Sequence, residues 1–121
     1  FGFTTGKPWL PLTNNWKELT VDKQSADPKS TLNLYRSALK LRADHLVTQG
    51  SITWLESPEH GAKSSSLLGV QRGNVSIYMN LSDLPVEVEI TGKLLIMSAG
   101  TVDGRDGKMT IPAVSTIWVH H

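Results

Sequence analysis

The sequence predicts a mainly β protein, an antiparallel β-sandwich preceded by an irregular lead and one α-helix. Three observations predict this order. Residues 1–26 are rich in Gly, Pro and aromatic residues and show neither helical nor strand periodicity. Residues 28–44 combine helix start signals with an apolar pattern of helical period. After residue 46, short apolar runs alternate with turn signals, which is typical of a sandwich.

The lead is long for a connection within a compact domain, where most connections have about six residues. It has no start Met, and it contains Trp9 and Trp16, the second of which follows the turn-like pair Asn14-Asn15. We expect a segment that lies over a partner surface, as a loop taken from a larger protein would.

The helix is expected over residues 28–44. Asp27 is a candidate N-cap, and Pro28 falls at the first helical position, where its missing N–H is not needed. At 100° per residue the apolar side chains cover an arc of about 200°, wider than one small core requires. They are Leu32, Leu34, Tyr35, Ala38, Leu39, Leu41 and Ala43. We therefore expect two packing partners, and in an isolated chain a homodimer or a lead folded over the helix.

The strand candidates are separated by turn signals such as Arg72-Gly73-Asn74 and Thr91-Gly92. Alternation is clearest in residues 86–90, which places Glu87 and Glu89 on one face and the apolar residues on the other. The predicted strands are Ser51–Leu55, Ser66–Gln71, Val75–Leu81, Val86–Ile90, Lys93–Ser98, Lys108–Ile111 and Ser115–Val119.

Composition excludes several classes of function. The net charge is +1 with both signs dispersed, which argues against nucleic acid or an anionic membrane as the main partner. No apolar run approaches the roughly 20 residues of a membrane span. The absence of Cys removes disulfides, thiol catalysis and Cys-based zinc sites.

Acidic residues suggest two sites, each with a simpler explanation. Retaining glycosidases use two carboxyl groups about 5–5.5 Å apart, but plain strand alternation favours a solvated face for Glu87 and Glu89. The run Asp103-Gly104-Arg105-Asp106-Gly107 has some features of a calcium loop. Arg105 and Val114 occupy positions where such a loop needs oxygen ligands, so a hairpin turn is favoured.

The histidines and serines do not indicate a metal site or a nucleophile. His120 and His121 are adjacent and would point to opposite faces of a strand, and His45 and His60 stand apart in the sequence. Ser64-Ser65-Ser66 is not part of a Gly-x-Ser-x-Gly elbow. We expect no metal and no cofactor.

The tryptophans are the main candidates for ligand contact, because an indole ring can stack on a sugar. Trp54 and Trp118 lie within strand runs, and core packing is predicted for both. Trp9 and Trp16 remain weak candidates for contact with a substrate.

The lead and the helix carry a family resemblance. It rests on Gly2-Phe3-Thr4-Thr5-Gly6-Lys7-Pro8-Trp9-Leu10-Pro11-Leu12, then Asp27-Pro28-x-Ser30-x-Leu32-x-x-Tyr35-Arg36, then Leu39-x-Leu41-Arg42. This series resembles the alpha-glucosidase and oligosaccharide-glucosidase branch of glycoside hydrolase family thirteen, the alpha-amylase superfamily. Residues 75–82 are similar to a strand of the family's final domain, and their continuation into residues 85–88 resembles actinobacterial members.

The resemblance implies two domains. Residues 1–45 would be the tail of the catalytic (β/α)8 barrel, namely the loop after its last strand and its last helix. Residues 46–121 would form the all-β domain C. The family's catalytic carboxylates lie upstream of this sequence, so no catalytic residue is assigned.

The function implied by the resemblance is structural. The chain would be the C-terminal portion of a cytoplasmic alpha-glucosidase-like hydrolase, with the missing barrel as its partner and an oligosaccharide bound through that barrel. The alternative is a free-standing carbohydrate-binding β-sandwich that uses exposed tryptophans.

Overall fold

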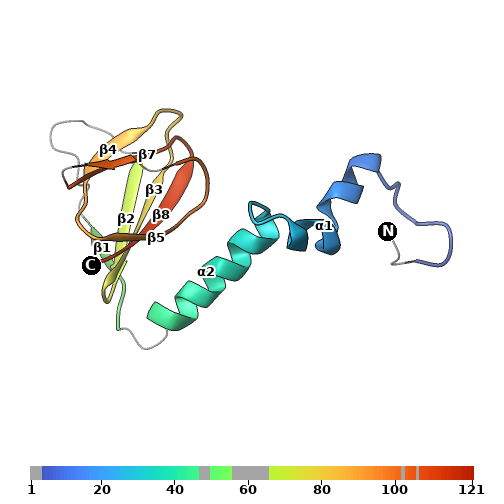
Figure 1. The fold of residues 1–121 in the computed structure, drawn as a ribbon, viewed down its shortest axis with the longest axis horizontal. Coiled ribbons are helices and arrows are strands. Elements are labelled where there is room, and N and C mark those ends of the chain that lie inside the picture. Colours follow the sequence, from blue (N-terminus) through green and yellow to red (C-terminus); the bar gives the residue numbers. More distant parts are fainter. Residues whose placement is uncertain (1–3, 47–49, 56–65, 102, 106) are drawn as a thin grey trace. The chain divides into compact units, whose positions relative to one another are not determined.

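The computed structural model describes residues 4–46, 50–55, 66–101, 103–105 and 107–121 (Figure 1). The chain divides into two compact units, Phe1–Leu39 and Lys40–His121. This boundary lies six residues before the expected one at residue 45, within a helix that both units share. Each unit is described by itself.

The lead is partly helical, so the prediction of an irregular segment is wrong for its second half. A 3₁₀-helix, η1, covers Asn14–Leu19, and a short α-helix, α1, covers Val21–Ala26. Each has six residues, too few for an apolar period to show in the sequence. Neither contains a buried residue. The Gln24 side-chain amide joins them by donating to the Leu19 carbonyl over 2.7 Å.

The predicted helix is confirmed as α2, Thr31–His45, but it begins three residues later than expected. Ser30 is its N-cap, because Ser30 Oγ accepts the Asn33 N–H at 3.2 Å and the Ser30 carbonyl accepts the Leu34 N–H. Asp27 does not cap the helix. Its carboxylate accepts the Lys29 N–H at 2.9 Å within the preceding turn.

The second unit is built of short antiparallel strands, as predicted. The seven predicted strands are present with ends shifted by at most two residues, and β6 is an addition. The strands are β1 Thr53–Leu55, β2 Leu67–Arg72, β3 Val75–Asn80, β4 Val86–Glu89, β5 Lys93–Met97, β6 Asp103–Arg105, β7 Lys108–Ile111 and β8 Ser115–His120. The sequence assigns residues 103–107 to a turn alone. Residues 103–105 instead extend as β6, and Gly107, with φ of 78°, lies between β6 and β7 in this hairpin.

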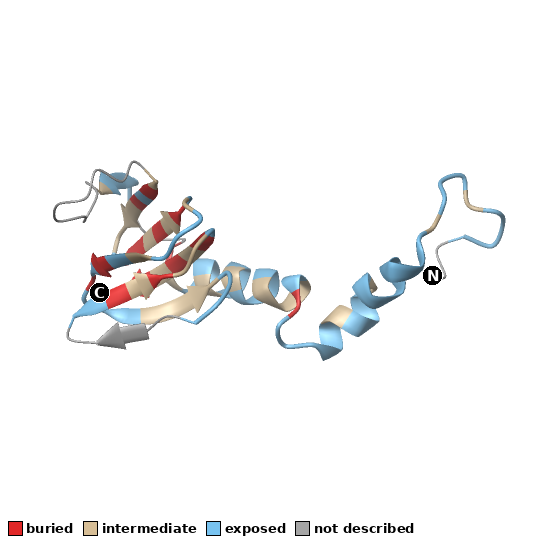
Figure 2. Ribbon diagram, turned by 90° about the horizontal axis from the view of Figure 1, so that it is seen from above, coloured by how far each residue is buried: buried red, intermediate tan, exposed pale blue. Residues whose placement is uncertain are grey.

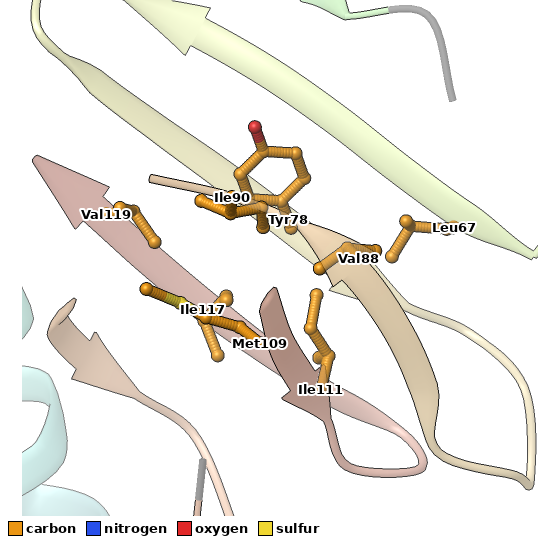
Figure 3. Packing of buried hydrophobic residues seen from close by; sticks show 8 residues of the cluster. All are labelled: Leu67, Tyr78, Val88, Ile90, Met109, Ile111, Ile117 and Val119. Atoms are coloured by element: carbon orange, nitrogen blue, oxygen red, sulfur yellow. The ribbon is translucent and has the colours of Figure 1, made fainter. Parts of the chain in front are cut away.

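Two sheets enclose the core. One has the strand order β1-β2-β3-β8-β5, the other β4-β7-β6. Figure 3 shows side chains from both sheets meeting in one cluster. Its members are Leu67, Tyr78, Val88, Ile90, Met109, Ile111, Ile117 and Val119. This arrangement confirms the predicted antiparallel sandwich.

Alternate residues of β8 face the core, and the strand register corrects the prediction for two tryptophans. Burial along β8 alternates, with Ile117 and Val119 fully buried and Trp118 only half-buried (Figure 2). Trp54 is 70% exposed, and the neighbouring Ile52 is exposed as well. The sequence shows which residues are apolar, but in a two-layer sandwich only the strand register decides which of them face inward.

A β-bulge interrupts the edge strand β5. Leu94 is opposite Val119 and Ile96 is opposite Trp118, so Leu95 has no counterpart on β8. The bulge keeps Leu94 and Met97 aligned with the inward residues of β8 while Ile96 is aligned with the outward one.

Asn80 at the end of β3 connects the two sheets. Its side-chain amide donates to three carbonyl oxygens, at 2.8 Å to Leu84, 3.3 Å to Ile111 and 2.9 Å to Pro112. Its Oδ1 accepts the N–H and the hydroxyl of Ser82. The side chain is buried and its hydrogen-bonding capacity is used in full.

Candidate functional site

The tryptophans of the lead are exposed. Trp9 is 96% exposed and Trp16 is 41% exposed. Trp16 lies in η1, and Trp9 lies outside any helix or strand. They are therefore accessible aromatic side chains.

The two acids of β4 form part of an exposed charged face. Glu87 Oε1 and Lys108 Nζ are 2.8 Å apart, and both side chains are exposed. The hydrogen bond to Glu87, followed by the charges of Glu87 and Glu89, raises the pKa of Lys108 above its usual 10.5. A glycosidase acid needs a buried, apolar setting that raises its own pKa. Glu87 and Glu89 lie instead on an exposed face beside a lysine, which is not a setting of that kind.

Three of the four histidines lie near the end of β8. The rings of His45 and His120 are 5.2 Å apart in an edge-to-face arrangement, and His121 Nε2 is 2.7 Å from Ser76 Oγ. Among the described residues, no three His, Asp, Glu or Cys side chains come together as a metal site would require. His60 and Ser64-Ser65 lie outside the described residues.

A line of apolar side chains crosses the five-stranded sheet on the side away from the core. The register places one residue of each strand opposite the next, from β1 through β2, β3 and β8 to β5. We call this line the outer row: Trp54, Val70, Ile77, Trp118 and Ile96. Adjacent strands are about 4.8 Å apart, so the outer row extends for about 19 Å.

Two further lines of residues flank the outer row. On one side, Leu68 is opposite Met79 and Met79 is opposite Thr116. On the other side, Val75 is opposite both Arg72 and His120. Sequence analysis missed this surface because it placed both tryptophans in the core. The signal that would have found it is the apolar character of consecutive residues in β5 and β8.

The second flanking line is partly covered by the end of α2. His45, the last residue of α2, contacts His120. Leu46, the residue after α2, is buried, and so is Val75. Neither is a member of the core cluster. The contact of His45 with His120 places the end of α2 at this end of the outer face, since His120 is on that face by register.

What the described residues offer is a candidate interaction surface on the five-stranded sheet. No described helix is long and apolar enough to cross a membrane. The core does not explain the apolar character of the sheet face built on the outer row.

Comparison with known proteins shows what this chain is similar to. Residues 1–50 match the model of the alpha amylase catalytic domain. The oligo-1,6-glucosidase of Halalkalibacterium halodurans is 31% identical over 80% of this chain and 18% of its own length. A probable alpha-glucosidase of Rhizobium meliloti is 33% identical over 78% of this chain and 17% of its own length. The chain thus spans less than a fifth of either relative.

Solved structures share the fold. The trehalulose synthase MutB from Pseudomonas mesoacidophila MX-45 superposes with a TM-score of 0.76 at 20% identity, over 98% of this chain and 23% of that protein. This likeness shows the fold, helices followed by an antiparallel β-sandwich. The relatives in sequence are alpha-glucosidases and oligo-1,6-glucosidases of the alpha-amylase family.

Proposed function

We propose that this chain is the C-terminal portion of an alpha-glucosidase-like glycoside hydrolase. Residues 1–45 are the tail of its catalytic barrel, and residues 46–121 are its domain C. The observation that carries the proposal is the order of two features: a match to the catalytic-domain model over residues 1–50, followed by an antiparallel β-sandwich. The much greater length of the relatives supports it.

The role of this portion is structural. The parent enzyme cleaves terminal α-linked glucose by double displacement through a covalent intermediate, using carboxylates of the barrel. The exposed setting of Glu87 and Glu89 beside Lys108 supports a role for β4 outside the reaction. The apolar side chains of α2 pack on the barrel in the parent, since α2 has no buried residue of its own in this chain.

The parent is a cytoplasmic protein, and the sequence features of residues 75–88 favour an actinobacterial source. The chain alone covers the apolar face of α2 in one of two ways, by forming a homodimer through that face or by folding its lead over it. Light scattering measures this association, and Leu34→Asp, which places a charge on that face, converts the dimer to a monomer. A wild-type chain that is monomeric at every concentration contradicts the dimer.

A carbohydrate-binding sandwich is the second candidate, because Trp9 and Trp54 are largely exposed. Isothermal titration with maltose and isomaltose separates the two candidates. Heat of binding that is lost in Trp54→Ala would support the second candidate. The proposed structural role predicts no binding to the chain alone.

Activity provides the direct test. The chain alone releases no nitrophenol from a nitrophenyl α-glucoside, whereas the product of the whole coding sequence releases it. Glu87→Gln and Glu89→Gln in that product leave its kcat unchanged. Release by the chain alone that disappears in either variant would contradict the proposal.

A further inference from the structure

We propose that His45 and His120 form a pH-sensitive contact between the end of α2 and the five-stranded sheet. The contact holds with at most one proton on the pair, and it opens when each ring carries a proton. The ring centroids are 5.2 Å apart in an edge-to-face arrangement. Both residues are half-buried and belong to the unit Lys40–His121. The contact lies within this one unit, so it is independent of the proposed function.

The neutral pair connects two element ends. His45 is the last residue of α2, and His120 is the last residue of β8. Neutral aromatic rings attract each other in an edge-to-face arrangement. Directly after His45, the Leu46 N–H donates to the Arg42 carbonyl at 2.9 Å, and Leu46 is buried. The last hydrogen bond of the helix is therefore next to the ring pair, and it reports whether the end of α2 stays in place.

The sheet around His120 carries positive charge. By register, Lys93 of β5 is opposite His120 on one side and Val75 of β3 is opposite it on the other, and Arg72 of β2 is opposite Val75. His120 thus lies in a line of residues on one face with a cation at each end. Directly opposite residues have Cβ atoms about 5 Å apart, so Lys93 is the closer cation. A proton gained by His120 meets like charge on its own sheet.

The helix contributes charges of both signs. Arg42 precedes His45 by three residues and therefore lies on the same side of α2. Asp44, the neighbour of His45, is paired with Lys40 at 2.7 Å. The carbonyl groups at the C-terminal end of a helix stabilise a positive charge placed there. One proton on His45 is therefore accommodated, whereas a further proton on His120 places two like charges 5.2 Å apart.

The direction of the pH response follows from linkage. Histidine is the side chain that gains its charge between about pH 8 and pH 5. Each ring takes its proton from the solvent, so the doubly charged pair is populated toward the acid end of this range. Separation of the rings removes the repulsion and makes the second protonation easier. Acid therefore opens the contact, and neutral pH closes it.

Amide hydrogen exchange read by NMR tests the proposal in the 121-residue chain. It is measured at about pH 7.5 and at about pH 5, and each rate is divided by that of an unstructured peptide at the same pH. We expect the protection of the Leu46 amide to fall about tenfold at the lower pH. The nuclear Overhauser contact between the two rings should disappear. Tyr78, in the middle of β3, is the internal reference and keeps its protection.

Aromatic variants separate charge from packing. His120→Phe keeps a ring in place but cannot be protonated, so the protection of Leu46 should change by less than about twofold between the two pH values. His45→Phe should give the same result. His121→Gln is the matched control, because His121 is engaged with Ser76 Oγ at 2.7 Å. It should retain the full response of the unmodified chain.

Two further measurements test the repulsion itself. Lys93→Gln removes the like charge opposite His120, so the fall in Leu46 protection should be smaller than in the unmodified chain. Salt needs no variant: about 1 M NaCl shortens the screening length to about 3 Å. The fall in the unmodified chain should then shrink severalfold.

Several outcomes would overturn the proposal. Unchanged protection of Leu46 at about pH 5 would show that the pair remains closed with two charges. An equal loss of protection at Leu46 and Tyr78 would show that acid unfolds the whole sandwich. A response that persists in His120→Phe, or that disappears in His121→Gln, would assign the titrating group elsewhere.

Discussion

At the scale of single residues, Asn80 shows how one buried amide holds two sheets together. It forms hydrogen bonds with three carbonyl oxygens and with two groups of Ser82, and its own side chain is buried. A buried polar group that loses its partner costs about 1–3 kcal/mol. The sequence marks Asn80 only as a member of a family-like strand, and the structure supplies the physical reason for an amide at this position.

Asn80→Ala should therefore destabilise the chain by about 3 kcal/mol, because all the hydrogen bonds of one buried side chain are lost at once. Denaturation in urea, followed by far-UV circular dichroism, measures the free energy of unfolding. Ser82→Ala is the matched control, since it removes one hydroxyl of the same network and should cost about 1 kcal/mol. Equal losses for the two variants would mean that Asn80 contributes no more than its hydrogen bonds to Ser82.

Lys108 offers a prediction of pH dependence. Its pKa is raised mainly by the hydrogen bond to Glu87, and the charge of Glu89 adds to this. Because the folded-state pKa is above that of the unfolded chain, the contribution of this pair to stability is complete below pH 10.5. It is lost as the pH rises through the raised value.

Glu87→Gln should lower the pKa of Lys108 toward its usual value, and Glu89→Gln should lower it by less. A titration of the Lys108 side chain by NMR follows both variants, with Lys93 as the internal reference. An unchanged pKa in Glu87→Gln would show that the ion pair does not persist in solution.

At the scale of elements, the beginning of α2 depends on Ser30. Its hydroxyl accepts the Asn33 N–H and donates to the Gln24 carbonyl at 2.6 Å, so one side chain serves both α2 and the end of α1. Ser30→Ala should cost about 1 kcal/mol, as losses of helix caps do. Asp27→Ala is the control, because Asp27 does not cap α2, and this variant should change the helix content less. Circular dichroism at 222 nm during thermal unfolding compares the two.

Strand β8 shows how neighbouring residues can differ in their contribution. Ile117 is fully buried in the core cluster, whereas Trp118 lies half-buried in the outer row. In the 121-residue chain, Ile117→Ala should cost about 2–5 kcal/mol. Trp118→Ala should cost less despite the larger side chain. A larger loss for Trp118→Ala would move the indole into the core, where the sequence places it.

These elements also show how much of the fold can be predicted from the sequence. Turn residues such as Gly73 and Gly92, together with β alternation, locate seven of the eight strands within two residues. The same signals cannot locate the core among consecutive apolar residues, since Leu94 and Ile96 differ in their orientation only because of a bulge. The cap at Ser30 and the helices η1 and α1 depend on local hydrogen bonds that leave no periodic signal.

At the scale of the whole molecule, the two units differ in what stabilises them. All members of the core cluster belong to Lys40–His121, and the one buried residue described in Phe1–Leu39 is Ser30. Stability is then unequal along the chain, because amide protection follows buried apolar contact. The exposed aromatic side chains of the lead contribute little to the stability of the chain.

Hydrogen exchange read by mass spectrometry should reveal this difference. We expect peptides from β3 and β8 to exchange orders of magnitude more slowly than peptides from η1 and α1. In the product of the whole coding sequence the lead should become protected as well, because the proposed barrel packs against it. Equal protection of both units in the short chain would show that the lead is already covered.

The bulge in β5 has a consequence for solubility. β5 is an edge of the five-stranded sheet, and its Leu94-Leu95-Ile96-Met97 run has the composition of a segment that pairs readily with a strand of another molecule. An interrupted ladder prevents a second strand from aligning along its whole length. Removing Leu95 would straighten this edge, and the chain would then become a template for its own aggregation.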